Sequence, residues 1–472
     1  MHLRIAMLAA CLGMASTSAA AVDQLLRNVN VIDIASGEIS PAQDIVVREG
    51  RISELGPTPL AAVGADIHDA GGAYVIPGLW DSHVHVFSSP QEPAAAFPLY
   101  LLNGITGIRD MGGLLPLAET KRTAAAVEAG EMLGPRIILS GAWVDASPGS
   151  WPGMFLADTP DEARAVVATI KDEGWAAVKS YSMLAEEVYL ALAAQAAAEE
   201  LPLVGHIPES VTLPTAVAAG HDVVEHFGRV TKACSPEEQA MIGRVRATLG
   251  SDAPRAAMIA EMAGHNRIVL ETWDEMLCDR VIAQMKNAGT YVTPTLIVSD
   301  FYVGARPADL EARMALLPDA ISEAWSKPDF RLDAMTDELR AIARQSIALD
   351  WRTFKRAHDA GVGILAGSDA SFANPFIFHG FSLLDEIDRY VAAGLTPQQA
   401  LFTATIAPAA FLGLSDESGR VAVGMRADLV LLDDNPLVGL ETLRQPRAVM
   451  VHGTLLDAAD LEAMRTTLRG GR

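Results

Sequence analysis

The sequence predicts an α/β protein built on a closed (β/α)8 TIM barrel, with a small discontinuous β-sandwich domain formed by both chain ends. Three observations predict this architecture: the length of 472 residues, eight short apolar segments that alternate with Ala-rich helical stretches, and similar β-rich segments at the two ends. Parallel strands joined by crossover helices produce such an alternation. Because a single core rarely grows beyond about 300 residues, we expect a second, smaller domain beside the barrel.

The predicted domain boundaries follow the change in sequence pattern. Residues 22–77 and 413–472 contain short alternating segments with glycine turns, which are typical of hairpins. Residues 78–412 contain the eight candidate strands, which are VIPGLWDSHVH, GITGIRDMG, RIILSG, AAVKSYS, LVGHIP, DVVEHF, YVTPTLIV and GILAGSDA. The connections after the sixth and seventh strands are unusually long, and they form either a lid over the barrel mouth or surface decoration.

Residues 1–21 have the layout of a secretory signal peptide, with Arg4 before an apolar stretch that ends in small residues. We therefore expect an exported protein, periplasmic or secreted, with a lipid anchor at Cys11 as the alternative. No later segment approaches the ~20 apolar residues of a membrane span. In an oxidising compartment, Cys234 and Cys278 form a disulfide or remain as two buried thiols.

The composition restricts the partners of the protein. Half of the residues are hydrophobic, which allows a sizeable core, and the formal net charge is -23. Nucleic acids bind to basic patches, and the sequence has no dense cluster of Lys and Arg. We expect a small-molecule or peptide substrate and no nucleic-acid partner, and the sequence leaves a homo-oligomer open.

Six side chains that can bind metals lie at the ends of predicted strands. His83 and His85 are two residues apart on the first strand, so their imidazoles point to the same face and can meet one cation. The other four end strands four, five, six and eight, and they are Lys179, His206, His226 and Asp369. In a barrel, chemistry is located at the C-terminal ends of the strands, so we expect these side chains to converge.

These motifs, in this order, resemble the amidohydrolase superfamily, in particular its imidazolonepropionase-like and prolidase-like (Xaa-Pro dipeptidase-like) branch. The resemblance runs from HVH after VIPGLWD, through GIRDMGG, GH, EH and GSDA, to GLTPQQALFTAT and GRVAVGMRADLVLLDDNP. It implies a centre of two divalent metal ions, and zinc is the default for a His-rich set. The implied ligands are His83, His85 and Asp369 on one metal, His206 and His226 on the other, and Lys179 as a carboxylated lysine that bridges both.

The implied chemistry agrees with the residue types. An ordinary lysine would repel metals, whereas its carbamate is an anionic ligand that can bridge a pair roughly 3.5–4 Å apart. A bridging hydroxide would attack the substrate, with Asp369 as general base and then general acid. We expect hydrolysis of a peptide-like amide in a small peptide or an N-acyl amino acid. The alternatives are a cyclic amide or lactone hydrolase, a detoxifying amidase for aromatic amides, and a metal-dependent binding protein without turnover.

Four further residues are weaker candidates for contacts with the substrate. Tyr181 shares the strand face of the predicted lysine ligand, where it donates a hydrogen bond to substrate or packs as an ordinary aromatic. Trp143 and Trp151 flank the loop after the third strand, and they line the pocket or belong to a surface loop. His379 lies in a His-Gly loop that often faces the substrate in the family that the sequence resembles. Arg109, by contrast, is expected to hold a loop.

Overall fold

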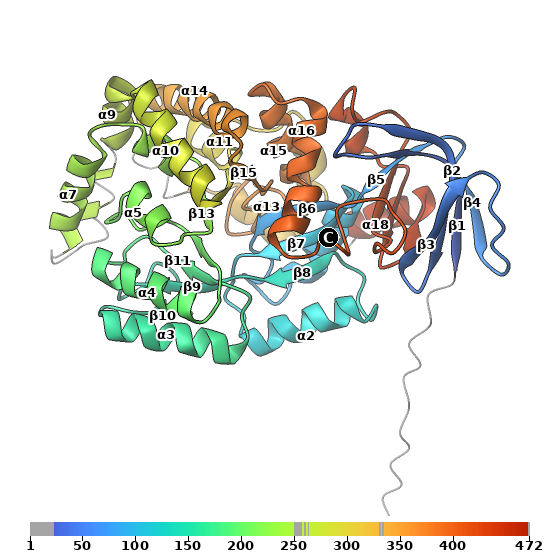
Figure 1. Ribbon diagram of the computed structural model, residues 1–472, viewed down its shortest axis with the longest axis horizontal. Coiled ribbons are helices and arrows are strands. Elements are labelled where there is room, and N and C mark those ends of the chain that lie inside the picture. Colours follow the sequence, from blue (N-terminus) through green and yellow to red (C-terminus); the bar gives the residue numbers. More distant parts are fainter. Residues whose placement is uncertain are drawn as a thin grey trace, which may run out of the picture.

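The computed structural model describes residues 23–249, 257–258, 261–262, 264–329, 332 and 335–470. The predicted signal peptide and Cys11 lie outside the described residues. The described chain is a mixed α/β protein with three sheets, and helices lie on both sides of the parallel strands (Figure 1). No helix among the described residues is long and apolar enough to cross a membrane.

Strands from both ends of the chain form one eight-stranded sheet in the order β18-β17-β16-β5-β1-β2-β3, with β4 paired to β1. Its central connection is the antiparallel pair of β5 and β16, in which Ile76 lies opposite Val430. The strands are β1 (Gln24–Ile32), β2 (Ile39–Arg48), β3 (Arg51–Pro57), β4 (Asp66–Asp69), β5 (Tyr74–Pro77), β16 (Leu429–Leu432), β17 (Ala448–Val451) and β18 (Thr454–Leu456). The two chain ends therefore share one sheet, whereas the division into domains at the predicted boundaries stays a prediction.

The middle of the chain contains two sheets whose strand pairs are all parallel. One has three strands in the order β6-β7-β8, and the other has seven in the order β10-β9-β11-β12-β13-β14-β15. The strands are β6 (Leu79–Val84), β7 (Ile105–Asp110), β8 (Arg136–Leu139), β9 (Ala142–Asp145), β10 (Phe155–Leu156), β11 (Val178–Ser180), β12 (Leu203–Gly205), β13 (Val223–Glu225), β14 (Tyr291–Thr293) and β15 (Gly363–Ile364). Alternation of strand and helix thus produces the parallel arrangement expected from it.

The described parallel strands form two sheets and not one continuous closed sheet, so closure into an eight-stranded barrel stays a prediction. The two parallel sheets are instead connected at both edges by isolated backbone hydrogen bonds. At one edge Ala176 N, just before β11, donates to Leu139 O at the end of β8 at 3.1 Å. At the other edge the segment after β15 contacts β6, where His85 N donates to Ala370 O at 2.9 Å. The ladder is interrupted there because the backbone of Asp369 is left-handed, with φ of 61°.

Helices connect the parallel strands and cover them. They are α1 (Glu92–Leu102), α2 (Leu117–Glu128), α3 (Pro160–Glu173), α4 (Glu186–Ala198), α5 (Leu213–Ala218), α6 (Gly228–Ala233), α7 (Glu238–Leu249), α9 (His265–Thr272), α10 (Glu275–Ala288), α11 (Val298–Val303), α12 (Leu310–Met314), α13 (Asp319–Trp325), α14 (Asp337–Ala360), α15 (Phe381–Ala392), α16 (Pro397–Thr403), α17 (Ile406–Phe411) and α18 (Ala458–Gly470), with a 3-10 turn η2 (Leu440–Arg444). Local sequence sets their limits: α3 begins at a capping box formed by Thr159 and Glu162 and ends at Gly174.

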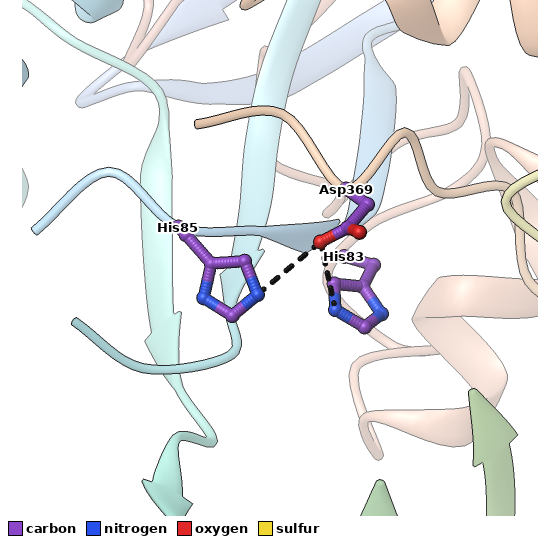
Figure 2. A group of neighbouring side chains, drawn as sticks. All are labelled: His83, His85 and Asp369. Carbon is purple, nitrogen blue, oxygen red and sulfur yellow. Dashed lines mark ion pairs between the residues drawn. The ribbon is translucent and has the colours of Figure 1, made fainter. Parts of the chain in front are cut away.

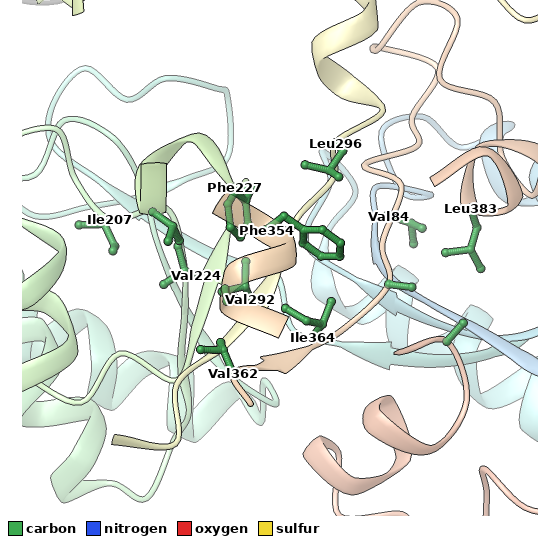
Figure 3. Close-up of a cluster of buried hydrophobic side chains, with 14 of the residues drawn as sticks. Val84, Ile207, Val224, Phe227, Val292, Leu296, Phe354, Val362, Ile364 and Leu383 are labelled. Atoms are coloured by element: carbon green, nitrogen blue, oxygen red, sulfur yellow. The ribbon is translucent and has the colours of Figure 1, made fainter. Parts of the chain in front are cut away.

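The longest helix, α14, packs on the strands through its last turns. Phe354 is fully buried, and its ring lies 5.7 Å from that of Phe227 in an edge-to-face contact. Val292 of β14 and Ile364 of β15 belong to the same buried cluster (Figure 3). This packing holds the long connections after β13 and β14 against the strand ends that carry the predicted ligands.

A disulfide joins Cys234 at the end of α6 to Cys278 in α10. The sequence left this pairing open, because the positions of two cysteines 44 residues apart depend on the folding of everything between them. The bridge ties the long connection after β13 to itself, close to the strand end that carries His226.

Candidate metal centre and active site

His83, His85 and Asp369 form a compact cluster at the end of β6 (Figure 2). Asp369 Oδ1 lies 3.4 Å from His83 Nε2 and 3.3 Å from His85 Nε2. One ligand atom from each residue lies within 4.8 Å of the others. The structure thus brings together three of the predicted ligands, since the i, i+2 spacing on a strand places both imidazoles on one face, while their role as ligands stays a prediction.

His206 and His226 form a second pair beside this cluster. They follow β12 and β13, and their Nε2 atoms are 3.0 Å apart. The opposite ring nitrogens are engaged, since His226 Nδ1 bonds to Thr295 Oγ1 at 2.7 Å and His206 Nδ1 bonds to Ser182 Oγ at 3.0 Å. The rings of His83 and His226 are 5.2 Å apart, so the pair adjoins the first cluster.

Lys179 lies on β11 and is almost fully buried. Its ammonium donates to Met111 O at 3.0 Å and lies 5.3 Å from the centre of the Trp143 ring. Burial lowers the pKa of Lys179 to about 8, against the opposing effect of nearby carboxylates. Gly205 allows this approach, because a Cβ there would lie 2.8 Å from Lys179 Cγ and the backbone has φ of +111°.

The lysine also lies near the histidines of both groups. Burial, followed by surrounding charges that include Lys179, lowers the pKa of His83 and His206 well below the usual range. The same causes lower the pKa of His226, although Asp369 and Glu225 oppose them. These imidazoles are consequently neutral at physiological pH, which is the form that binds metal ions.

Two properties of the histidine nitrogens and the Asp369 oxygen suit metal binding: their separations, and a buried nitrogen that has no hydrogen-bond partner. Ligands that lie about 2.0–2.1 Å from a tetrahedral zinc ion are about 3.3 Å from each other. The observed separations of 3.0–3.4 Å match this edge length. His83 Nε2 is buried without a hydrogen-bond partner, which is costly unless a ligand satisfies it. Burial opposes ionisation of Asp369, yet the neighbouring histidines hold its pKa below the usual range.

Glu225 is a buried carboxylate beside the cluster that the sequence analysis missed. Its Oε2 accepts a hydrogen bond from His83 Nδ1 at 2.7 Å, and its Oε1 accepts one from Arg109 Nη2 at 2.6 Å. A hydrogen bond at Nδ1 fixes the tautomer and turns the free Nε2 toward Asp369. Arg109 supports Glu225 in addition to its bond to Ser82 O. The signal in the sequence was an acidic residue within the otherwise apolar strand DVVEHF.

Asp81 connects the two segments that carry the first cluster. It accepts hydrogen bonds from Ser368 N at 2.9 Å, from Ser368 Oγ at 2.5 Å and from His83 N at 3.3 Å. Burial raises its pKa to about 7. Gly367 permits the close contact of these segments, since a Cβ there would lie 2.8 Å from His83 Cβ. The tether therefore sets the distance between the histidines and Asp369.

Two of the predicted aromatic residues border the metal ligands. Tyr181 stacks on His206 with ring centres 4.3 Å apart, and its hydroxyl accepts a hydrogen bond from Trp151 Nε1 at 2.9 Å. Trp143 lies 5.4 Å from the His85 ring and donates through Nε1 to Met111 O. Both rings are thus placed beside the centre, with Trp151 more exposed at its rim.

His379 is located elsewhere, which corrects its predicted role as a substrate contact. The residue is 1% exposed, and both ring nitrogens are engaged: Nδ1 with Tyr100 Oη at 2.7 Å and Nε2 with Glu92 Oε1 at 2.8 Å. Because both polar atoms are satisfied inside the protein, the side chain has no capacity left for a substrate. It connects α1 to the segment after β15.

A cavity of about 550 Å³ opens beside the second histidine pair. His206 and His226 line it together with apolar side chains of α9 and α14, among them Val269 and Leu349. A pocket of this size accommodates a small organic substrate. The long connections after β13 and β14 therefore build the wall of a cavity at the ligand residues.

Comparison with known proteins identifies the family. The model of the amidohydrolase family matches residues 74–456. The chain belongs to the amidohydrolase family. This confirms the resemblance inferred from the motifs, and the matched region contains all six residues expected to bind metal.

Similar solved structures show the same fold. Bottromycin amidohydrolase has a TM-score of 0.70 at 24% identity, and the alignment covers 95% of this chain and 89% of that one. A Xaa-Pro dipeptidase with methionine bound in its active site has a TM-score of 0.63 at 20% identity, with 92% and 100% covered. At these identities the likeness concerns the fold and leaves the substrate undetermined.

Similar curated sequences include adenine deaminases. Adenine deaminase 2 of Agrobacterium fabrum is 25% identical over 457 residues, which is 95% of this chain and 60% of the deaminase. An adenine deaminase of Listeria monocytogenes is 39% identical over 93 residues, which is 15% of its length. This amidohydrolase thus spans less than two thirds of the length of these relatives.

Proposed function

We propose that this protein is an exported, binuclear metal-dependent amidohydrolase that cleaves a peptide-like C–N bond in a small peptide or an N-acyl amino acid. One observation carries the proposal. Two groups of side chains have donor atoms at the spacing of metal ligands, and a buried lysine lies beside them; the groups are the cluster of His83, His85 and Asp369 and the pair of His206 and His226. The two parallel sheets with hydrogen bonds at both edges support a closed barrel of eight strands.

In this proposal the ligands divide into two groups. His83, His85 and Asp369 would hold one ion, and His206 and His226 would hold the other. Lys179 would supply a shared anionic ligand after its neutral amine has added to carbon dioxide, which forms a new N–C bond and releases one proton. When bound, the two ions, zinc by the softness of the ligands, lower the pKa of a water and polarise the substrate carbonyl.

The protein's own residues supply the proton transfers and the positioning. Asp369 accepts a proton from the attacking water and delivers it to the leaving nitrogen, as general base and then general acid. Tyr181, stacked on His206, is placed to orient the substrate carbonyl or carboxylate. Glu225 keeps His83 in the tautomer that leaves Nε2 free.

The disulfide between Cys234 and Cys278 supports the proposed export, because disulfides persist in oxidising compartments. The proposal rests on the amino-terminal sequence and on this bridge together. Fractionation of expressing cells, with amino-terminal sequencing of the mature protein, would locate it. Recovery of the uncleaved chain in the cytoplasm would contradict export.

The adenine deaminase relatives make an aminopurine the main rival substrate. In both reactions water displaces nitrogen from carbon, so the ligand set alone does not separate them. The test is a panel of dipeptides, N-acyl amino acids, a lactone, an anilide and adenine, assayed with zinc and bicarbonate. Release of a free amino acid supports the proposal, and ammonia release from adenine alone contradicts it.

Asp369→Asn is the matched variant for this panel. Asparagine keeps the shape of the side chain but loses the base, so we expect turnover to fall by about 10²–10⁴-fold while much of the metal stays bound. Metal content is measured by elemental analysis on the same preparation. Turnover at the wild-type rate would contradict the assigned role, and full metal binding with no turnover of any substrate by the wild-type protein would indicate a binding protein.

A further inference from the structure

Two buried cations line the cavity beside the second histidine pair. Arg229 and Lys232 are 9% and 8% exposed, and both belong to α6, which begins two residues after His226. Their spacing of i, i+3 places them on one face of the helix. His226 and both cations therefore line the same cavity.

The two cations share a single carboxylate. Glu209 Oε2 lies 3.3 Å from Arg229 Nη1 and 3.1 Å from Lys232 Nζ. Burial opposes ionisation of Glu209, yet the two cations lower its pKa, so it carries one negative charge against two positive ones. Glu209 follows His206 by three residues, as Arg229 follows His226, so the charged group is built from the same two strand ends as the histidine pair.

Among the other acidic groups of the cavity, Glu225 is already paired with Arg109 and His83, so it does not balance the second cation. Burial raises the pKa of Asp350, which lines the cavity from α14, to about 7, so the group is partly protonated at neutral pH. Burial also raises the pKa of Glu238, whose Oε1 accepts a hydrogen bond from Leu213 N. A cation without a full counter-charge in a buried site attracts an anion strongly, because water screens it poorly.

We propose that Arg229 and Lys232 bind the free carboxylate of the substrate, so that the enzyme selects amides whose leaving amine is an amino acid. The inference rests on the proposed function, and it names the substrate class of that site. The apolar walls formed by α9 and α14 would receive the side chain of the leaving amino acid. A cavity of about 550 Å³ is large enough for an N-acyl amino acid.

The first measurement compares N-acetyl-L-leucine with its neutral carboxamide as substrates of the zinc-loaded full-length protein. We expect kcat/KM to favour the acid, and Lys232→Met to lower the acid-to-amide ratio by about 10- to 100-fold through loss of a charged hydrogen bond. Lys327→Met is the matched control, because Lys327 is an exposed lysine in a surface pair with Glu323 and should leave the ratio unchanged.

The second measurement needs no turnover. N-acetyl-L-leucine and its carboxamide are titrated by calorimetry into the zinc-loaded Asp369→Asn protein, alone and combined with Lys232→Met or Glu209→Gln. Lys232→Met should weaken binding of the acid, whereas Glu209→Gln should strengthen it by removing the competing carboxylate. Damage to the fold cannot produce this opposite pair of effects.

The outcomes separate the two proposals. Equal kcat/KM for acid and amide, with binding insensitive to both substitutions, overturns the carboxylate site while leaving amide hydrolysis intact. Binding of the acid that depends on Lys232, without hydrolysis of either compound by the wild-type protein, supports the carboxylate site and contradicts the proposed reaction.

Discussion

Replacement of Glu225 by glutamine should weaken the metal centre more than it weakens the fold. In the wild-type protein the carboxylate accepts hydrogen bonds from His83 Nδ1 and from Arg109 Nη2, and all three side chains are buried. A glutamine amide keeps the shape but has one accepting oxygen, so it cannot accept both bonds. Either the His83 ring loses its anchor or Arg109 loses its buried counter-charge.

The expected size of the effect follows from these contacts. A hydrogen bond to a charged group contributes about 1.5–3 kcal/mol to stability. Loss of the partner that orients a metal-binding histidine typically lowers metal affinity by about 10- to 100-fold. Since each tenfold change corresponds to about 1.4 kcal/mol, zinc binding should weaken by about 1.4–2.7 kcal/mol.

The assay is competition for zinc against a chromophoric chelator, together with guanidinium unfolding of the zinc-free protein. Glu92→Gln is the matched control, because Glu92 is equally buried and accepts bonds from His379 Nε2 and from Phe372 N. Both bonds go to Oε1, which a glutamine retains, so the variant should leave zinc affinity unchanged. Wild-type zinc affinity in Glu225→Gln, or equal losses in both variants, would refute the argued role of Glu225.

Three further predictions follow from buried groups. Lys179→Ala should abolish activity and reduce the amount of bound metal, and added acetate should restore part of the activity. After labelling with 13C-bicarbonate, the wild-type protein should give a carbamate signal that the variant lacks. The same signal in both proteins would contradict the assignment. Burial raises the pKa of Glu386 to about 7 from 4.5, so the folded state holds the proton more tightly than the unfolded state does. The free energy of unfolding should therefore fall by up to about 3 kcal/mol as the pH rises from 4.5 to 7. Glu386→Gln should make the free energy of unfolding less dependent on pH, and an unchanged dependence would contradict this prediction. Cys234→Ser opens a loop of 44 residues and should lower the free energy of unfolding by up to about 4 kcal/mol, because the unfolded chain gains entropy. The midpoint of guanidinium unfolding measures this loss, and an unchanged midpoint in the variant would contradict the prediction.

The sequence predicted the parts of the molecule that depend on local pattern. Period-two alternation with glycine turns indicated strands at both ends, and HVH placed two imidazoles on one strand face whatever the rest of the fold does. The alternation of apolar segments and helices predicted parallel strands, because a parallel connection requires a crossover. It did not predict the break in the ladder at Asp369, since a left-handed backbone there depends on contacts with β6.

The residues missed or misplaced are those whose role depends on a distant partner. Glu225 and His83 are 142 residues apart, and no local pattern relates a buried carboxylate to the imidazole that it orients. His379 lies near the strand end that carries Asp369, yet its ring is taken up by Tyr100 and Glu92 of α1.

The sequence by itself determined the family, the candidate ligands and the alternation of strands with helices, because each is written in short motifs and their spacing. Only the tertiary structure decided which buried charges pair with which, where the cavity opens, and that Arg229 and Lys232 share one carboxylate. The physical reason is that a charge buried away from water is stabilised only by the groups that the fold brings near it. Which groups these are depends on the packing of the whole chain.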